Sequence, residues 1–441
     1  MTTLSLCFAL LASAGDDPAQ WPHWRGPGAD GVALGAAPRE WSDAQGVRWK
    51  VVVPGRGVST PIVYGDALFL TTAVPTQPET APAEAPAEAP AEDGRGRMSS
   101  GPPAQQSFEL HCLERRTGAT RWKAVARVAT PHEGFHKSYG SFASASPVTD
   151  GQRVYVNFGS QGVYAYDFDG KLAWSFDPGV KLVMRNSFGE GLAPVLAGNA
   201  LVQVADQEQG SFAFALDKHT GKELWRVARD EPSTWATPLV TEVGGTLQVI
   251  TAGTTRTRAY APDSGKLLWQ APGVGVNAIP SVVRAGDLAL VMSGYREAKI
   301  VALRLPGQSI AALELGADAL AWSATKGCAY TASPVLVGGL YYTVTDRGLI
   351  SCFDATTGAA HYLEERLPRG SALKSSPIAA GEFLYVPTEA GEVHLIRLGP
   401  EYVVAGTNVL AEQVFVASPA CAQGELFLRS LTHLFCIGSD G

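Results

Sequence analysis

The apolar positions of this chain fall into short runs separated by glycine-containing turns, and no stretch keeps a sustained helical period. Residues 193–225 hold four such runs: one after Pro194, one at 200–205, one at 212–216 and one from Leu224. A Gly-Asn pair and an Asp-to-Gly turn separate the runs, as hairpins require. This pattern predicts a four-stranded antiparallel sheet, which is too small to be stable alone.

The same unit recurs along the chain. A proline that opens a strand is found at Pro61, Pro147, Pro194, Pro238, Pro280, Pro334, Pro377 and Pro419. An aromatic residue opens or marks the fourth strand at Trp49, Trp122, Trp174, Trp225, Trp269, Trp322 and, more weakly, Tyr362 and Tyr402. The first aromatic precedes the first proline, so the strand at 47–53 is expected to complete the C-terminal sheet. The sequence therefore predicts an all-β fold, an eight-bladed β-propeller of four-stranded antiparallel blades closed into a ring.

The turn sequences carry a family resemblance. Asp217-x-x-Thr-Gly-Lys-x-x-Trp225 is repeated, with variations, before Trp122, Trp174 and Trp269, and its first half recurs at 354–358. These motifs resemble the tryptophan-docking repeat of the pyrroloquinoline-quinone (PQQ) β-propeller family. The opening segment at 21–32 is also similar to the start of many bacterial members. The family includes quinoprotein dehydrogenases and non-catalytic propellers such as the BamB-like factors of outer-membrane protein assembly, so the resemblance implies the fold more firmly than an activity.

Composition fits one large exported β domain. The 441 residues are 46% hydrophobic and 17% charged, with 48 glycines, 29 prolines and a net charge of −7. This charge argues against nucleic acid or an anionic membrane as the main partner. Residues 1–14 are predicted to be a signal peptide, with an apolar run and a small-residue cleavage site, which indicates a periplasmic or extracellular protein. No other stretch approaches the length of a transmembrane helix.

Two segments fall outside the repeat. Residues 15–46 are expected to pack on the propeller (47–441), held there by Trp21, Trp24 and Trp41. Residues 75–107 contain an Ala-Pro-Ala-Glu repeat that cannot build a core and is predicted to be disordered. The insertion lies in the loop between the second and third strands of blade one. It should overhang the face of the propeller on which the first strands begin. It either covers the central funnel or is merely tolerated there.

The cysteines do not form a disulfide framework. Cys112, Cys352 and Cys436 align with alanines of other blades and are expected to fill a small slot between sheets, while a bridge between Cys421 and Cys436 is left open. There is no adjacent Cys-Cys pair. The resemblance implies such a vicinal disulfide in quinoprotein alcohol dehydrogenases, so its absence counts against that activity.

Two further motifs match the sequence of a known site. Residues 132–136, His-Glu-Gly-Phe-His, match the zinc-protease pattern, but the neighbouring proline and glycines predict a loop and not the required helix. The glycines at 273 and 275 resemble half of a dinucleotide-binding motif, but a proline and a strand follow where a helix is needed. Both are interpreted as chance matches.

Candidate binding residues come from loops that should converge at the funnel mouth. Loops entering the first strands supply one group, and loops between second and third strands supply the other, with Asp206, Glu208 and Glu389 as acids on the same face. The candidates are Tyr139, Arg185, Asn186, Trp235, Asn277 and Lys374 from the first group, and Arg256, Arg296 and Arg347 from the second. Such a polar, aromatic and basic mouth suits a peptide, a glycan or an acidic partner.

No catalytic arrangement can be defended from spacing. The hypothesis favoured is a non-catalytic, monomeric propeller that binds a protein or a cell-envelope polymer without a cofactor, in outer-membrane protein assembly by analogy with the family. The alternative is a quinoprotein oxidoreductase that uses PQQ and Ca²⁺, for which the resemblance implies a Glu/Asn/Asp calcium site that cannot be placed here. A third hypothesis, a sugar-acting enzyme, would need paired carboxylates in the funnel.

Overall fold

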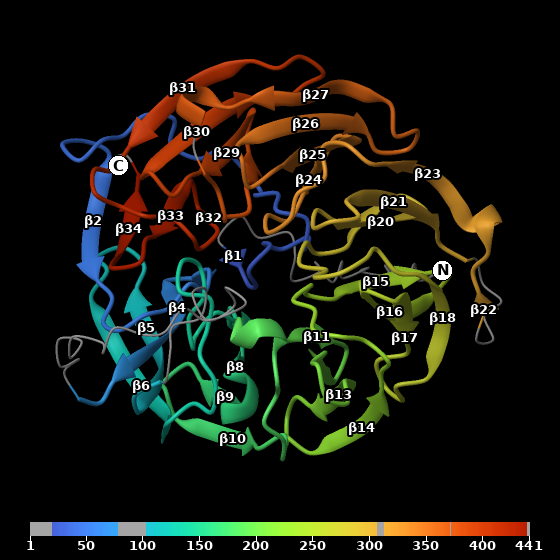
Figure 1. Cartoon of the computed structure of the whole chain (residues 1–441). Helices are drawn as coiled ribbons and strands as arrows, with labels where there is room; N and C mark the ends of the chain where they lie inside the picture. Colours follow the sequence, from blue (N-terminus) through green and yellow to red (C-terminus); the bar gives the residue numbers. More distant parts are fainter. Residues whose placement is uncertain (1–19, 78–102, 307–312, 371, 439–441) are drawn as a thin grey trace, which may run out of the picture.

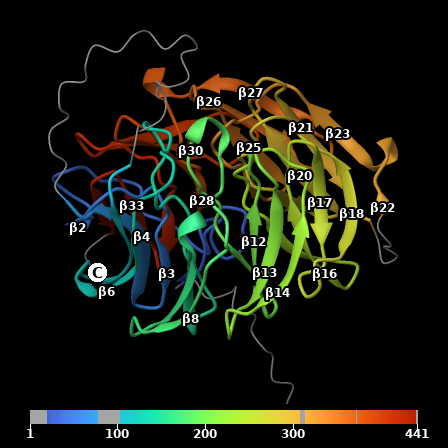
Figure 2. The same ribbon diagram turned by 60° about the horizontal axis from the view of Figure 1, so that its bottom comes forward.

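Eight β-sheets form a closed ring around a central axis in the computed structural model, which describes residues 20–77, 103–306, 313–370 and 372–438 (Figure 1). The first strand of each blade lies nearest the axis and the fourth lies at the rim. The predicted all-β, eight-bladed propeller is therefore confirmed. Figure 2 shows the same ring from another side.

The strands follow the repeat. Blade one contains β1 (Gln20–Trp21), β3 (Ile62–Tyr64), β4 (Ala67–Pro75), β5 (Gln106–Glu114) and β6 (Thr120–Ala129), and blade two contains β7 (Val148–Thr149), β8 (Arg153–Asn157), β9 (Val163–Asp167) and β10 (Leu172–Phe176). Blade three contains β11 (Val195–Ala197), β12 (Ala200–Ala205), β13 (Phe212–Asp217) and β14 (Glu223–Ala228). Blade four contains β15 (Leu239–Val243), β16 (Thr246–Thr251), β17 (Arg256–Tyr260), β18 (Leu267–Pro272) and β22 (Leu313–Glu314).

Blade five contains β19 (Val283–Ala285), β20 (Leu288–Ser293), β21 (Lys299–Arg304) and β23 (Leu320–Ala324), and blade six contains β24 (Val335–Val337), β25 (Leu340–Val344), β26 (Leu349–Asp354) and β27 (Ala360–Arg366). Blade seven contains β28 (Ile378–Ala380), β29 (Phe383–Pro387), β30 (Glu392–Arg397) and β31 (Val404–Val409). Blade eight contains β32 (Ala420–Ala422), β33 (Glu425–Arg429), β34 (His433–Ile437) and β2 (Val47–Val52). Short 3-10 turns are η2 (Gly159–Gln161), η3 (Arg185–Ser187), η4 (Ala317–Ala319) and η5 (Pro368–Gly370). No helix in the described ranges is long and apolar enough to cross a membrane.

The ring closes as predicted. β2 pairs antiparallel with β34, and Trp49 lies opposite Cys436. An early strand thus completes the last sheet, and Figure 1 shows the blue β2 beside the red β34. This pairing gives the last blade its fourth strand.

The repeat tryptophans dock on the following blade. Trp225 packs on Gly265, and its Nε1 donates a hydrogen bond of 2.8 Å to the carbonyl of Pro262. The same contact joins Trp49 to Gly118, Trp122 to Gly170, Trp174 to Gly221 and Trp322 to Gly358. These five tryptophans therefore have a structural role, because each one packs between two neighbouring sheets.

A small residue lies opposite each docked ring. Ala165, Ala215, Ala259 and Ala302 pair with tryptophans, and Cys112, Cys352 and Cys436 pair with Trp122, Tyr362 and Trp49. The cysteine slot is thus as predicted. The five cysteines in the described part of the chain are buried and free, so Cys421 and Cys436 are not bridged.

Two blades depart from the repeat. In blade seven the prediction of Tyr402 was wrong: Gly406 faces Leu395 at the aromatic position, and Tyr402 lies before β31 and packs on Tyr362. In blade four Trp269 donates to Gln248 of its own blade, because blade five lacks the Asp-to-Gly turn. Here β22 pairs in parallel with β18 instead.

The N-terminal segment enters the ring. β1 pairs with β3 at the axial side of blade one, and Trp21 is fully buried. The buried Arg25 donates to the carbonyls of Pro334 and Pro377, the prolines that open the first strands of blades six and seven. Trp41 stacks on Tyr385. The described part of this segment, from residue 20 on, therefore packs on the propeller.

The insertion in blade one is shorter than its predicted limits. β4 extends to Pro75, which pairs with Gln106 of β5, so residues 75, 106 and 107 belong to the sheet. Strand pairing was underestimated here because a proline is tolerated near the end of a strand. The amide of Thr76, beyond this proline, still donates to the carbonyl of Gln105 at 3.0 Å. Residues 78–102, and residues 1–19 with the predicted signal peptide, lie outside the described part of the chain.

Candidate functional site

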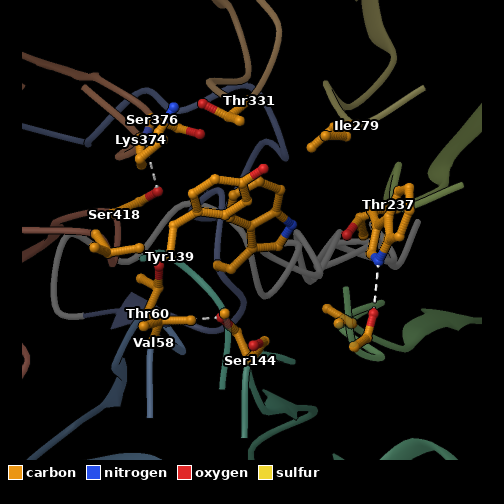
Figure 3. Close-up of a pocket in the computed structure, with 18 of the residues that line it drawn as sticks. Val58, Thr60, Tyr139, Ser144, Thr237, Ile279, Thr331, Lys374, Ser376 and Ser418 are labelled. Carbon is orange, nitrogen blue, oxygen red and sulfur yellow. Dashed lines mark hydrogen bonds between the residues drawn. The ribbon is translucent and has the colours of Figure 1, made fainter. Parts of the chain in front are cut away.

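A funnel-shaped pocket of about 180 Å³ lies where the eight first strands begin (Figure 3). Its wall follows a simple rule in the sequence. The residues one and three positions before the strand-opening proline face the pocket in nearly every blade, with Asn277 and Ser333 as the exceptions. The residue between them is buried among the blades. This alternation is the period of two of extended chain.

Every blade contributes to this wall. At three positions before the proline the lining residues are Val58, Ser144, Gly191, Trp235, Thr331, Lys374 and Val416; at one position before, they are Thr60, Ser146, Ala193, Thr237, Ile279, Ser376 and Ser418. Serine hydroxyls on this wall connect neighbouring blades by hydrogen bonds. The Ser376 hydroxyl accepts a hydrogen bond from the Ser333 amide at 2.9 Å, and the Ser418 hydroxyl accepts one from the Ser376 amide at 3.0 Å.

The N-terminal segment forms the floor. Trp24 lines this pocket and also a second cavity of about 290 Å³ formed with residues 22–29 on the other side. It therefore separates the two spaces along the axis. The indole gives the funnel an apolar aromatic base.

One side of the funnel mouth carries a charged and aromatic network. Lys374 Nζ lies 2.5 Å from a carboxylate oxygen of Asp346 and 4.9 Å from the centre of the Tyr139 ring. Asp346 also accepts hydrogen bonds from the amide and hydroxyl of Thr331, at 3.0 and 2.9 Å. Tyr139 stacks on His136, with the ring centres 3.6 Å apart. Burial and the nearby Lys374 lower the pKa of His136 to about 4, so this ring is neutral at pH 7.

Further aromatic side chains continue the wall. Trp235 Nε1 donates to the carbonyl of Gly189 at 2.8 Å. Tyr330 accepts a hydrogen bond from Asn277 at 3.2 Å and stacks on Tyr295. Of the predicted candidates, the structure thus brings Tyr139, Trp235 and Lys374 into the pocket and places Asn277 directly behind it.

The other predicted candidates lie away from the pocket. Arg185 lies 3.5 Å from Glu208 in the loop entering blade three, beside the exposed Asn186. Arg256 pairs with Glu314 of β22 at 3.2 Å. Arg296 and Arg347 are exposed, and Arg296 lies over the Tyr295 ring. These arginines belong to the surrounding surface.

The acids of blade three are not free to bind a ligand at the funnel, contrary to the prediction. Asp206 is fully buried and pairs through both oxygens with Arg229, at 2.6 and 3.0 Å. Glu208 accepts hydrogen bonds from the amide and hydroxyl of Ser233. The sequence does not indicate that Arg229 is the partner of Asp206, because a full hairpin separates the two residues along the chain. Glu389 is half-buried, and its burial raises its pKa.

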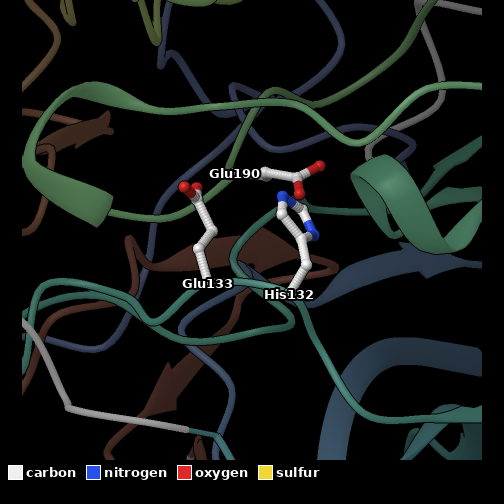
Figure 4. Close-up of side chains that lie close together, drawn as sticks. All are labelled: His132, Glu133 and Glu190. Carbon is white, nitrogen blue, oxygen red and sulfur yellow. The ribbon is translucent and has the colours of Figure 1, made fainter.

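A second cluster lies behind the funnel wall. His132, Glu133 and Glu190 present side-chain ligand atoms within 4.8 Å of one another (Figure 4). His132 and Glu133 come from the loop entering blade two, and Glu190 comes from the loop entering blade three. Glu190 also lines the funnel pocket. The residues 131–140 form a loop, as predicted, and His136 is not part of the cluster.

Both acids of this cluster have perturbed acidities. Burial raises the pKa of Glu190 to about 8, against hydrogen bonds from Ser160 that favour the carboxylate. Burial also raises the pKa of Glu133 to about 7, against a hydrogen bond from the Met184 amide. Burial thus disfavours the charged form of both carboxylates.

Sequence reasoning missed Trp24, Phe188, Tyr330 and Glu190 as lining residues. Counting one and three residues back from the proline of each blade would have found most of the inner wall. Glu190 lies four residues before Pro194, and Tyr330 four before Pro334, so a longer count would have included both.

Comparison with known proteins identifies the family. A family described as outer membrane protein assembly factor BamB matches residues 106–360 and, in a second register, 214–399. The chain belongs to this family of PQQ-like β-propellers. BamB of Burkholderia pseudomallei (strain K96243) is 26% identical over 259 residues, which is 55% of this chain and 61% of that protein. The alignment thus spans less than two thirds of that relative.

Solved structures share the fold of this PQQ-like propeller. BamB from Moraxella catarrhalis superimposes with a TM-score of 0.55 at 12% identity, covering 75% of this chain and 93% of that one. Quinohemoprotein alcohol dehydrogenase from Comamonas testosteroni gives a TM-score of 0.62 at 12% identity, covering 97% and 82%. Fold alone does not decide between a binding protein and an enzyme.

The funnel residues provide a test of fit for PQQ, a flat quinone that carries several carboxylates. Among the described residues lining the pocket, the charged side chains are Lys374, which is already paired with Asp346, and Glu190, an acid. No described cysteine lines the pocket. This donor set does not fit a multiply anionic quinone, and we derive no step that passes through it.

Proposed function

We propose that this propeller is a non-catalytic binding protein of the cell envelope, which holds a protein partner at its funnel face during outer-membrane protein assembly. The observation that carries the proposal is the funnel itself, whose wall is built by all eight blades and whose floor is Trp24. It is a preformed pocket of about 180 Å³, large enough for one anchoring side chain of a partner.

The chemistry of the pocket suits a polypeptide. Trp24, Phe188, Trp235 and Tyr330 supply apolar surface for an aromatic or aliphatic anchor. Serine and threonine hydroxyls on the inner wall supply hydrogen bonds, and Lys374, paired with Asp346, adds a polar group at the mouth. Interfaces are usually built in this way, with an aromatic anchor site and a polar rim. The assembly role itself is carried over from the BamB family.

The second candidate function is a quinoprotein oxidoreductase, the class of the Comamonas testosteroni enzyme that shares this fold. A tryptophan-fluorescence titration with PQQ, with and without Ca²⁺, run beside a dye-linked alcohol oxidation assay, separates the two functions. The proposal expects neither saturable binding nor turnover. Calcium-dependent binding with turnover would replace it.

The partner is tested in cells of the source organism. Deleting the gene should lower the level of folded outer-membrane proteins, and expression of the wild-type chain should restore it. A chain with Trp235→Ala and Lys374→Met should fail to restore it although it is folded and abundant. Arg296→Ala, an exposed change outside the pocket, is the matched control and should restore it. Unchanged outer-membrane protein levels in the deletion strain would remove the assembly role.

A further inference from the structure

We propose that His132, Glu133 and Glu190 bind one first-row divalent cation, best matched by Zn²⁺, between the loops that enter blades two and three. The site is separate from the proposed function of the funnel. It rests on the geometry of the imidazole, on a small cavity and on two half-buried carboxylates.

The imidazole of His132 is oriented as a metal ligand. Its Nε2 lies 2.7 Å from the carbonyl oxygen of Leu182, which can only accept, so Nε2 carries the proton. The lone pair of the neutral ring is then on Nδ1. That atom is buried, and no hydrogen-bond partner lies within reach of it among the described residues. Metal-binding histidines typically donate their second N–H to such a carbonyl, which fixes the ring and the tautomer.

Figure 4 shows the side chains of His132, Glu133 and Glu190 gathered together, with the Glu190 carboxylate next to the imidazole ring. One oxygen of each carboxylate and one ring nitrogen of His132 lie within 4.8 Å of one another. Metal–ligand bonds of about 2.0–2.2 Å place the ligand atoms of a tetrahedral centre roughly 3.4 Å apart, so small side-chain rotations bring the set together. One imidazole and two carboxylates are a ligand set for Zn²⁺, and the two negative charges balance the cation.

The space available is that of a single ion. A cavity of about 20 Å³ is lined by His132, Glu133 and Glu190 together with apolar neighbours such as Phe108 and Phe158. This volume suits one ion or one water and excludes a larger ligand. The hydrophobic surroundings disfavour two unbalanced carboxylates, so the site needs a neutralising partner.

The loops are built to hold Glu190 in place. The hydroxyl and the amide of Ser160 donate to its two oxygens, at 2.7 and 2.5 Å. Gly159 has a φ of +58°, and a Cβ at that position would overlap the Glu190 carboxylate. Ser160 Oγ in turn accepts from the amide of Leu182, whose carbonyl holds His132. One short network thus orients both the acid and the imidazole.

The zinc-protease interpretation differs in its ligands. That pattern would use His132 and His136, but His136 stacks on Tyr139 and is not in the cluster. The proposed cation instead joins two loops of neighbouring blades. It would stiffen the funnel wall at Glu190, and we assign it no hydrolytic step.

The test uses the mature protein stripped with a chelator and then titrated with Zn²⁺ against a chromophoric competitor. Wild type is expected to bind one Zn²⁺ per chain, and Co²⁺ is expected to give the visible bands of a low-coordinate site. His132→Gln and Glu190→Gln should each weaken binding by at least about tenfold, the scale seen even for outer-shell partners. His136→Gln is the matched control and should leave the affinity unchanged.

Circular dichroism and the urea midpoint check that each variant folds, and Glu133→Gln replaces a variant that does not. Three results would overturn the proposal: absence of stoichiometric Zn²⁺ binding by the folded wild type, equal affinity in the His132 and Glu190 variants, or loss of binding in His136→Gln. Binding of Ca²⁺ or Mg²⁺ in preference to Zn²⁺ would also contradict it, because the imidazole would then not be a ligand.

Discussion

Trp225 of blade three lies against Gly265 of blade four, and a Cβ built on that glycine would be 2.7 Å from the indole ring. The same glycine has a φ of +68°. The tryptophan and the glycine are therefore one unit of packing, repeated around the ring, and they explain why the turn and the aromatic recur together in the sequence.

Replacement of Gly265 by alanine should destabilise the ring. Strain at positive φ costs about 1–2 kcal/mol, and forcing the methyl group against the indole adds about 1–3 kcal/mol. Gly245 has a φ of +80° with open space around it, so Gly245→Ala should show the strain alone. Urea unfolding of both variants measures the difference, and equal losses would contradict the docking account.

This repeat is the reason that the sequence predicted the fold so completely. The strand pattern of a single blade is a weak signal, but its repetition around the ring makes the prediction of the fold strong. Because Trp49 precedes Pro61, the sequence also indicates that the strand containing Trp49 completes the last blade. Where one copy deviates, the argument fails locally. In blade seven Gly406 occupies the position at which Tyr402 was expected. The strand pairs normally there, although no aromatic side chain marks it.

The candidate site was predicted only in part. Tyr139, Trp235 and Lys374 reach the funnel because their position before a strand is fixed by the repeat. Side chains from loops between second and third strands are not fixed in this way, and Arg256 turns to Glu314. The His132 and Glu190 contact depends on the path of two loops, which no local pattern reveals.

The buried pair of Asp206 and Arg229 should be sensitive to loss of one partner. Arg229→Met leaves the Asp206 carboxylate buried with Thr234 as a remaining donor, and we expect a loss of about 3–5 kcal/mol. Arg121, in a partly exposed pair with Glu114, is the matched control, and Arg121→Met should cost only about 0–1 kcal/mol. Chemical unfolding of the two variants checks this. Similar losses in both would mean that Arg229 does not serve to balance a buried charge.

The N-terminal segment should make stability depend on pH. Burial, with a smaller effect of Arg25, lowers the pKa of His23 from 6.5 to about 4. The unfolded chain therefore binds a proton that the folded chain rejects, so this contribution to stability is complete above pH 6.5 and is lost as the pH falls through 4. Its upper bound is about 3 kcal/mol, from 1.36 kcal/mol per pKa unit.

Urea unfolding between pH 7.5 and pH 4 measures this effect. His23→Gln carries no titrating ring, and its stability should fall less over that range than that of the wild type. A change of the same size in both proteins would contradict the assignment to His23.

The central claim is that the funnel holds a protein partner, and the most direct measurement is affinity copurification of the chain with the barrel-assembly machinery from cells of the source organism. The account predicts that the wild-type chain and Arg296→Ala retain these components in equal amounts. It predicts that the combined Trp235→Ala and Lys374→Met variant loses most of them while its urea midpoint stays unchanged. Retention that does not depend on these two residues, or absence of the machinery from the wild-type sample, would contradict it.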